Sequence, residues 1–365
     1  MRRRDVIKGL GLGAAAAAAA AACSRDAKQA DLVESGRTHE WRLVTTWPAN
    51  FPGLGTGATE FARRVEACSG GRLKIRVYGD GELVPAFEIF DAVATGTAEM
   101  GHGAAYYWKG KVPASSFFAS IPFGLTAQEM NAWLYFGGGW ELWKEAYAPF
   151  GLIPAPCGSS GCQMGGWFRK EIRSMADLKG LKMRIPALGG EVIARAGGTP
   201  VTMPGSEIFT SLQSGAIDAT EWIGPYNDLA FGLYKAAKYY YYPGWHEPGS
   251  TLEMIINRGA FESLPEDLRE IVMACAGATN DRMLAEFTAR NAEALQTLVR
   301  DHGVELRAFP DDVMRELKRL SAEVLAEAAA ADPLFRRVLE SLQAFQQRMT
   351  PYLDIAERAY LNARA

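Results

Sequence analysis

WRLVTTW at residues 41–47 and RLKIRVY at residues 72–78 are the two stretches that decide the fold class. The first is a compact apolar run that ends at Pro48, as a strand does. The second alternates basic and apolar residues, which predicts a strand with one buried face. Helical spacing follows each of them, at residues 59–68 and 85–94. This β-α-β-α order predicts an α/β sheet with helices on its faces.

The same alternation returns in the second half of the chain. A helix is predicted at residues 190–196, and a short strand follows through Met203. Ser206 can N-cap a helix that runs to Ser214, and residues 217–222 predict another strand.

The domain organisation follows from where these patterns change. Residues 24–39 are polar and predict a linker. We expect one α/β lobe mainly from residues 40–160 and a second mainly from residues 161–260. Apolar residues at three- and four-residue spacing then predict a helical return segment and a C-terminal tail at residues 261–365.

The N-terminus has the composition of an export signal. Residues 2–8 form a basic region, and residues 9–22 are an uncharged run too short for a bilayer span, which needs about 20 residues. Residues 1–22 therefore predict a signal peptide, and the pair Arg3-Arg4 resembles a twin-arginine signal. Small residues before Cys23 resemble a lipobox, with plain cleavage in the same stretch as the alternative. We expect a periplasmic protein, either free or lipid-anchored through Cys23.

The charge of the chain excludes one class of partner. The formal net charge is −3, and removing residues 1–22 changes it to −6. Nucleic-acid binding would require a basic excess, so no nucleic-acid partner is expected. An anionic ligand would have to be held by a local arginine or a bound cation. The sequence also contains no phosphate-binding loop, zinc-protease or serine-hydrolase motif.

The cysteines leave two alternatives open. Cys157 and Cys162 are close in sequence, and an oxidising compartment would permit a disulfide between them. Free thiols at these positions and at Cys68 and Cys275 fit equally well. No Cys-x-x-Cys pair is present, so the sequence does not support a zinc or redox motif.

Three segments combine polar side chains with strand ends or glycines. Gln163 is flanked by glycines, Arg184 ends a short strand, and Glu221 stands where a strand passes into a Gly-Pro loop. A guanidinium binds a carboxylate through two parallel hydrogen bonds, and carboxylate and amide oxygens suit a hard cation. Glu247 could add a second carboxylate. Each residue alone also fits an ordinary role as a surface charge, a loop carboxylate or a turn residue.

Aromatic residues cluster in the same regions. Tyr106 and Tyr107 follow a glycine, and four consecutive tyrosines occupy residues 239–242. Such runs usually pack in a core, and the functional alternative is an aromatic wall around a small ligand.

These residues carry a resemblance to a known family. The chain resembles the extracytoplasmic solute receptors of TRAP transporters over residues 40–360. The resemblance is carried by GELVP at residues 81–85, DLKGLKMR at residues 177–184 and LQSGAID at residues 212–218. It implies a two-lobed periplasmic binding-protein fold with hinge strands and a long connecting helix. It also implies membrane subunits as partners.

A narrower resemblance is to the receptors for 2-oxo monocarboxylates. It is carried by QMGGWFR (163–169), ATEW (219–222), GPY (224–226) and YYYYPGW (239–245). It implies a non-enzymatic receptor for an acid of the pyruvate type, and a homodimer that exchanges a C-terminal helix. Cys157 and Cys162 depart from the pattern, and Cys23 is unusual for a freely soluble receptor.

The resemblance also implies roles for individual residues. A sodium ion would be held by Gln163, Glu221, the Trp222 carbonyl and Glu247, whereas related receptors use calcium and lactate in a similar site. Arg184 would pair with the ligand's carboxylate, and Tyr106 and Tyr107 would lie near the ligand.

The sequence therefore predicts capture of a small 2-oxo acid with a cation for sodium-driven uptake. The first alternative is a calcium-dependent receptor for lactate or another 2-hydroxy acid. The second is an exported, metal-assisted enzyme that acts on a small organic acid with Glu221 as general base. No nucleophile–base pair is recognisable for it. A signalling co-receptor would share the same site and differ in its partners.

Overall fold

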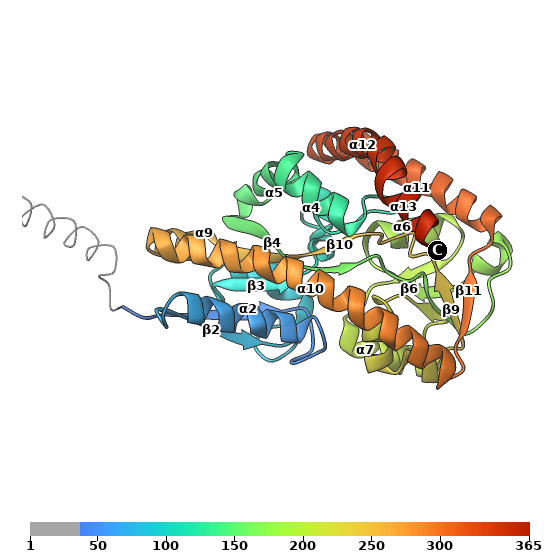
Figure 1. Cartoon of the computed structure of the whole chain (residues 1–365), viewed down its shortest axis with the longest axis horizontal. Coiled ribbons are helices and arrows are strands. Elements are labelled where there is room, and N and C mark those ends of the chain that lie inside the picture. Colours follow the sequence, from blue (N-terminus) through green and yellow to red (C-terminus); the bar gives the residue numbers. More distant parts are fainter. Residues whose placement is uncertain (1–36) are drawn as a thin grey trace, which may run out of the picture. The chain divides into compact units, whose positions relative to one another are not determined.

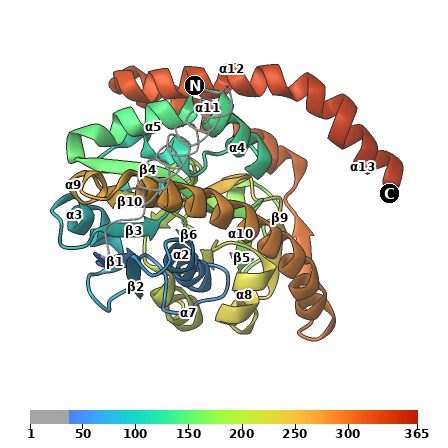
Figure 2. The same ribbon diagram turned by 60° about the vertical axis from the view of Figure 1, so that its left-hand side comes forward.

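The computed structural model describes residues 37–365 (Figures 1 and 2). The predicted signal peptide at residues 1–22, Cys23 and most of the predicted linker at residues 24–39 lie outside the described residues. In the described part of the chain, no helix combines the length and the apolar character needed to cross a membrane.

Five strands form the first sheet, in the order β2-β1-β3-β10-β4. β1 pairs with β3 in parallel, whereas β10 runs antiparallel to both β3 and β4. The bounds of these strands are His39–Thr45 for β1, Leu73–Tyr78 for β2, Met100–Gly103 for β3, Leu152–Gly161 for β4 and Ser250–Asn257 for β10.

Six short strands form the second sheet, in the order β11-β9-β5-β8-β6-β7. β6 lies parallel to both β7 and β8, and β5 lies antiparallel to β8 and β9. The bounds are Gly166–Phe168 for β5, Lys182–Arg184 for β6, Thr199–Val201 for β7, Ala219–Thr220 for β8, Tyr239–Tyr242 for β9 and Glu305–Ala308 for β11.

The helices between these strands differ widely in length. Six of them have ten residues or more. The α-helices are α2 (Gly55–Cys68), α3 (Ile89–Ala94), α4 (Ala127–Phe136), α5 (Gly139–Tyr147), α6 (Ala187–Arg195), α7 (Gly205–Ser214), α8 (Pro225–Phe231), α9 (Arg258–Glu262), α10 (Glu266–Arg300), α11 (Asp311–Ala331), α12 (Pro333–Leu353) and α13 (Ala359–Arg364).

The long helix α10 contacts elements of both sheets' layers. Its 35 residues span about 50 Å at 1.5 Å per residue. It packs against β4 and α2 near the first sheet and against α8 near the second, and Figure 2 shows it crossing the molecule between them. A buried apolar cluster that includes Leu43, Phe61 and Val272 seals α2 and α10 onto the first sheet.

The chain passes between the sheets at two short connections that matter for the site. β4 of the first sheet leads through residues 162–165 into β5 of the second. β9 of the second sheet leads through residues 243–249 back into β10 of the first. Because β4 and β10 pair with each other, these two connections leave the first sheet side by side.

Several predicted elements have different bounds in the structure. The predicted strand at residues 217–222 is limited to Ala219–Thr220, because the chain leaves the sheet to begin α8 at Pro225. Residues 261–365 are mostly helical, and β11 within them, Glu305–Ala308, extends the second sheet. The predicted helix at residues 85–94 divides into a 3-10 turn at Ala86–Glu88 and α3.

The predicted N-cap at Ser206 is wrong. Helix α7 begins one residue earlier, at Gly205, and Pro204 occupies the N-cap position. The Ser206 hydroxyl instead donates a hydrogen bond to Asp80 Oδ2 at 2.8 Å, 126 residues away in sequence.

The four cysteines within the described residues are free thiols. Cys157 is buried within β4, and Cys162 is exposed just beyond its end. A strand extends by about 3.3 Å per residue, so the stretch from residue 157 to residue 161 spans roughly 13 Å. A disulfide requires Cα atoms within about 7 Å, and the bond that the sequence allowed between these cysteines is therefore not formed.

Candidate functional site

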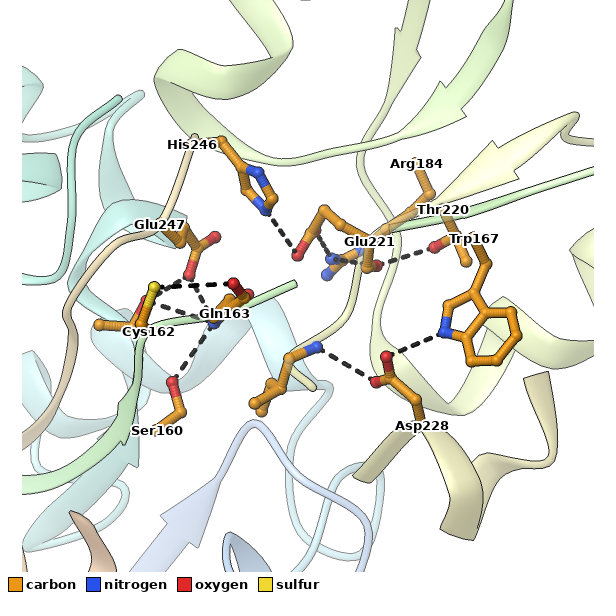
Figure 3. A network of polar contacts seen from close by, with 12 residues as sticks. Ser160, Cys162, Gln163, Trp167, Arg184, Thr220, Glu221, Asp228, His246 and Glu247 are labelled. Atoms are coloured by element: carbon orange, nitrogen blue, oxygen red, sulfur yellow. Dashed lines mark hydrogen bonds and ion pairs between the residues drawn. The ribbon is translucent and has the colours of Figure 1, made fainter. Parts of the chain in front are cut away.

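Parallel pairing of two short strands brings Arg184 next to Glu221. Arg184 ends β6 and lies opposite Thr220 on β8, so Glu221 follows directly after the paired residues. The Glu221 amide donates to the Arg184 carbonyl at 3.1 Å. The side chains then form an ion pair between Arg184 Nη1 and Glu221 Oε1 (Figure 3). Each side chain is only 1% exposed, so the charges lie in an interior where an unpaired charge would be costly.

The guanidinium of Arg184 has contacts on every side. Its Nε and Nη2 atoms donate to the Met203 carbonyl at 3.3 Å, and Nη2 also donates to the Tyr107 hydroxyl at 3.4 Å. The group lies over the Trp222 ring, 5.2 Å from its centroid. Burial alone would lower the pKa of Arg184, but the charge of Glu221 and the neighbouring tyrosines raise it above its ordinary value. Arg184 therefore remains a fixed positive charge.

A second polar group forms where the two connections leave the first sheet. Gln163 lies in the connection after β4, and Glu247 lies in the connection before β10. The Gln163 backbone amide donates to the Glu247 carbonyl at 3.1 Å, and its side-chain Nε2 donates to Glu247 Oε2 at 2.8 Å. The hydroxyls of Ser160 and Ser250 accept from the same Nε2 atom at 3.3 and 3.2 Å. The amide nitrogen is therefore committed to these partners.

The two glutamates of the site influence each other. Burial, followed by the negative charge of Glu221, raises the pKa of Glu247 well above its ordinary value. The nearby positive charge of Arg184 and a hydrogen bond from Ser250 act in the opposite direction. Two buried carboxylates therefore share one arginine, an arrangement that a bound cation would relieve.

Several polar atoms of the site lack a hydrogen-bond partner among the described residues. They are the Gln163 Oε1, the Glu221 Oε2, the Trp222 Nε1 and both ring nitrogens of His246. Buried polar groups are normally satisfied, so these atoms indicate a binding site. The carboxylate and amide oxygens are ligands that suit a hard cation such as sodium or calcium. The residues present therefore fit a bound cation.

Tyr106 and Tyr107 lie in a 3-10 helix at Ala105–Trp108. Tyr107 accepts the hydrogen bond from Arg184, and the rings of the two tyrosines meet edge to face with centroids 4.8 Å apart. Burial raises the pKa of Tyr106 well above its ordinary value, and the charges of Glu247 and Glu221 raise it further. Both tyrosines thus face the same cluster of charges.

Trp222 joins the cluster through its side chain. The indole packs edge to face against Trp47 and Phe51, with centroid distances of 6.2 and 6.4 Å. It therefore lies between β8 and the segment that follows β1. The role of its carbonyl as a cation ligand stays a prediction.

Sequence reasoning missed two residues of this region. His246 is 2% exposed, and its Nε2 lies 3.5 Å from Glu221 Oε2 (Figure 3). Asp228 accepts hydrogen bonds from the Trp167 indole at 2.9 Å, the Tyr240 hydroxyl at 2.6 Å and the Ile223 amide at 3.3 Å. It thereby fixes the loop that carries Glu221. The position of His246 directly before Glu247 was a signal that could have identified it. Nothing in the sequence marked Asp228.

The chain is similar to proteins that bind solutes outside the cytoplasm. Residues 43–332 match the family described as bacterial extracellular solute-binding protein, family 7. The chain is also 45% identical over 322 residues to the monocarboxylate 2-oxoacid-binding periplasmic protein of Nostoc sp., with 88% of each chain covered.

Two solved structures agree with this likeness. A TRAP periplasmic solute-binding protein from Pseudoalteromonas atlantica, with bound sodium and pyruvate, is 42% identical with a TM-score of 0.87, covering 89% of this chain and 99% of that one. A TRAP transporter solute-binding protein from Bordetella bronchiseptica is 37% identical with a TM-score of 0.88, covering 90% and 98%. The latter is a mixed-occupancy dimer, with copurified calcium and picolinate in one active site and the other site apo.

Proposed function

Because the chain belongs to family 7 of the bacterial extracellular solute-binding proteins, we propose that it is the extracytoplasmic receptor of a TRAP transporter. It captures a small 2-oxo monocarboxylate, such as pyruvate, together with a cation and delivers the acid to membrane subunits for uptake. The observation that carries this proposal is the buried Arg184–Glu221 pair beside the unpartnered oxygens of Gln163 and Glu221. The names and bound ligands of the similar proteins support the same ligand class.

Each residue of the site has a distinct role in this proposal. Arg184 pairs with the ligand's carboxylate through its guanidinium, which matches that group in shape and charge. Gln163, Glu221, the Trp222 carbonyl and Glu247 hold the cation. Tyr106 and Tyr107 form the wall beside the ligand, as their contact with Arg184 and the glutamate charges supports. The cation neutralises the glutamates, which would otherwise repel an incoming anion.

The choice between sodium and calcium depends on the charge of the site. Two ionised carboxylates favour calcium, whereas one ionised carboxylate favours sodium. Sodium is our primary proposal, and the Pseudoalteromonas structure, which holds sodium together with pyruvate, supports it. Calcium is the alternative, as in the Bordetella structure.

We extend the proposal to the assembly of the protein. The lobes, mainly residues 40–160 and 161–260, close around the ligand, and the protein acts in the periplasm, with lipid attachment at Cys23 as an optional tether. A homodimer forms through the C-terminal tail. Exposed apolar side chains on that tail support the dimer: Tyr352, Ile355, Tyr360 and Leu361.

Calorimetric titration of metal-stripped protein with pyruvate tests this function. We expect pyruvate to bind in the presence of sodium or calcium. We expect little binding in a buffer that contains neither ion, because the cation would bind the acid directly. Lactate in place of pyruvate separates a 2-oxo from a 2-hydroxy receptor. Pyruvate recovered unchanged after prolonged incubation supports a receptor, whereas a product seen by NMR would establish an enzyme.

A further inference from the structure

Two free cysteines lie on helices α2 and α10, which pack side by side (Figures 1 and 2). Cys68 is the last residue of α2, and Cys275 lies in the first half of α10. Cys68 is exposed at the surface, whereas Cys275 is only 4% exposed. The proposed capture of an acid uses neither thiol.

Each cysteine lies on the face that its helix presents to the other. Val65 and Cys68 are three residues apart on α2, and Val272 and Cys275 are three residues apart on α10, so that each pair shares one side of its helix. Val65, Val272 and Cys275 belong to the same buried apolar cluster. The spacing therefore places Cys68 at the surface end of this interface.

Contacts on either side of the cysteines fix the register of the helices. Near the start of α2, a Cβ atom added to Gly57 would lie 2.3 Å from Met283 Cε, so the two helices approach each other closely there. Just beyond the end of α2, Arg72 forms an ion pair with Asp267, near the start of α10. The helices therefore run antiparallel, and both cysteines lie between these two contacts.

The Cys68 thiol also contacts the thiol of Cys275. Burial, the charge of Cys68 and a side-chain hydrogen bond with Cys68 together raise the pKa of Cys275 to about 11. Cys157 on β4 is the other candidate partner, because burial, followed by the charge of Cys275, raises its pKa as well. Its side chain is 0% exposed, however, whereas Cys68 lies where an oxidant can reach it.

We propose that Cys68 and Cys275 form a disulfide that fastens α2 to α10 once the protein is outside the cytoplasm. Extracytoplasmic compartments are oxidising and allow such bonds to persist. The inference goes beyond the proposed receptor function. It takes from that function only the location of the protein, and it does not depend on which solute the site binds.

The bond forms by exchange with an external disulfide, such as that of a dithiol–disulfide oxidoreductase or oxidised glutathione. The exposed Cys68 thiolate attacks one sulfur of that disulfide and forms a mixed disulfide, while the other sulfur leaves as a thiolate. The Cys275 thiolate then attacks the Cys68 sulfur and displaces the second thiolate of the oxidant. The two cysteines are oxidised and the oxidant's S–S bond is reduced, and its thiolates take up the protons that the cysteines lost.

Peptide mapping of the purified full chain tests the pairing. The folded protein is incubated with oxidised glutathione, its remaining thiols are alkylated in acidic denaturant, and the digest is analysed by mass spectrometry. We expect one linked peptide pair that contains Cys68 and Cys275. If both thiols are alkylated, if Cys68 carries glutathione, or if Cys275 is linked to Cys157, the proposal is wrong.

Thermal melts with and without reductant give a second readout. Reduction of the oxidised wild type should lower its melting temperature by about 5 °C or more, because a disulfide that closes a long segment constrains the unfolded chain. Cys68→Ser, at an exposed position, should melt at the same temperature with and without reductant. Cys162→Ser is the matched control, since Cys162 is also exposed, and it should respond to reductant as the wild type does. An equal response in Cys68→Ser and wild type would overturn the proposal.

Discussion

The guanidinium of Arg184 and the carboxylate of Glu221 form an ion pair in which each side chain is 1% exposed. The pair arises from parallel strands whose last residues lie opposite each other. The same arginine also contacts Tyr107, which lies far away in sequence in a helical turn after β3. One side chain thus links a carboxylate of the second sheet with a tyrosine that follows the first.

Replacing Arg184 should abolish acid capture. Arg184→Ala leaves Glu221 and Glu247 buried without their positive partner, which we expect to cost about 3–5 kcal/mol of unfolding free energy. Pyruvate affinity should fall by about a hundredfold or more, because the paired hydrogen bonds to its carboxylate are lost. Arg184→Lys retains the charge without the planar fork and should bind with intermediate affinity.

Calorimetry and thermal melts of both variants measure these effects. Arg300→Ala is the control, because Arg300 forms an exposed pair with Asp301. Wild-type affinity in folded Arg184→Ala would show that another group binds the carboxylate.

Asp228 is expected to act through the loop that it holds. Asp228→Ala removes the acceptor for Trp167, Tyr240 and the Ile223 amide, leaving three buried donors unpartnered. We expect acid affinity to fall by roughly tenfold, because Glu221 and Trp222 lie just before Ile223. Trp167→Phe is the control, since it removes one donor and leaves the loop bonded. If Asp228→Ala lowers the melting temperature without changing affinity, its role is structural only.

We expect Glu253 to make the stability of the folded protein depend on pH. It is fully buried in β10, where it accepts hydrogen bonds from the Trp108 indole and the Tyr147 hydroxyl. Burial raises its pKa to about 7, against the opposing effect of both hydrogen bonds. The folded state therefore holds a proton that the unfolded chain releases at lower pH. Its contribution to stability is full at low pH and is lost as the pH rises through about 7.

Glu253→Gln should remove this dependence, because glutamine does not ionise. Relative to the variant, we expect the wild type to lose about 3 kcal/mol of unfolding free energy between pH 4.5 and pH 7.5. Urea unfolding of ligand-free protein across this range measures the difference. Glu262→Gln, at an exposed position, serves as the control. If the unfolding free energies of wild type and Glu253→Gln differ by the same amount at every pH, Glu253 does not cause the pH dependence.

The C-terminal tail should control the oligomeric state. Ile355 is 78% exposed and Tyr360 is 64% exposed, on a segment that Figure 2 shows leading away from the sheets. The double variant Ile355→Glu, Tyr360→Glu places charges on this apolar surface and should produce monomers in sedimentation experiments, without loss of pyruvate binding. Leu83→Glu changes an exposed apolar residue outside the tail and should leave the dimer intact. A dimer that survives the double variant would place the interface elsewhere.

The sequence predicted the α/β class and most elements because their signals are local. Arg184 and Glu221 could each be assigned to a strand end from nearby residues alone. Their contact could not be predicted, because the two residues are 37 positions apart and meet only when β6 and β8 pair in parallel. Gln163 and Glu247 are 84 residues apart and meet only through the pairing of β4 with β10. His246 escaped notice for a related reason, since an unpartnered imidazole is recognisable only once its neighbours are known.

The paired connections between the sheets have a consequence for release. Gln163 and Glu247 lie in the two connections through which the chain passes from one sheet to the other. In our proposal both residues hold the same ion. An ion bound there would hold the two connections together, so that loss of the ion and opening of the lobes become a single event. Such a receptor would discharge ion and acid together, one for one, and its loading would report the product of two concentrations rather than the concentration of the acid alone.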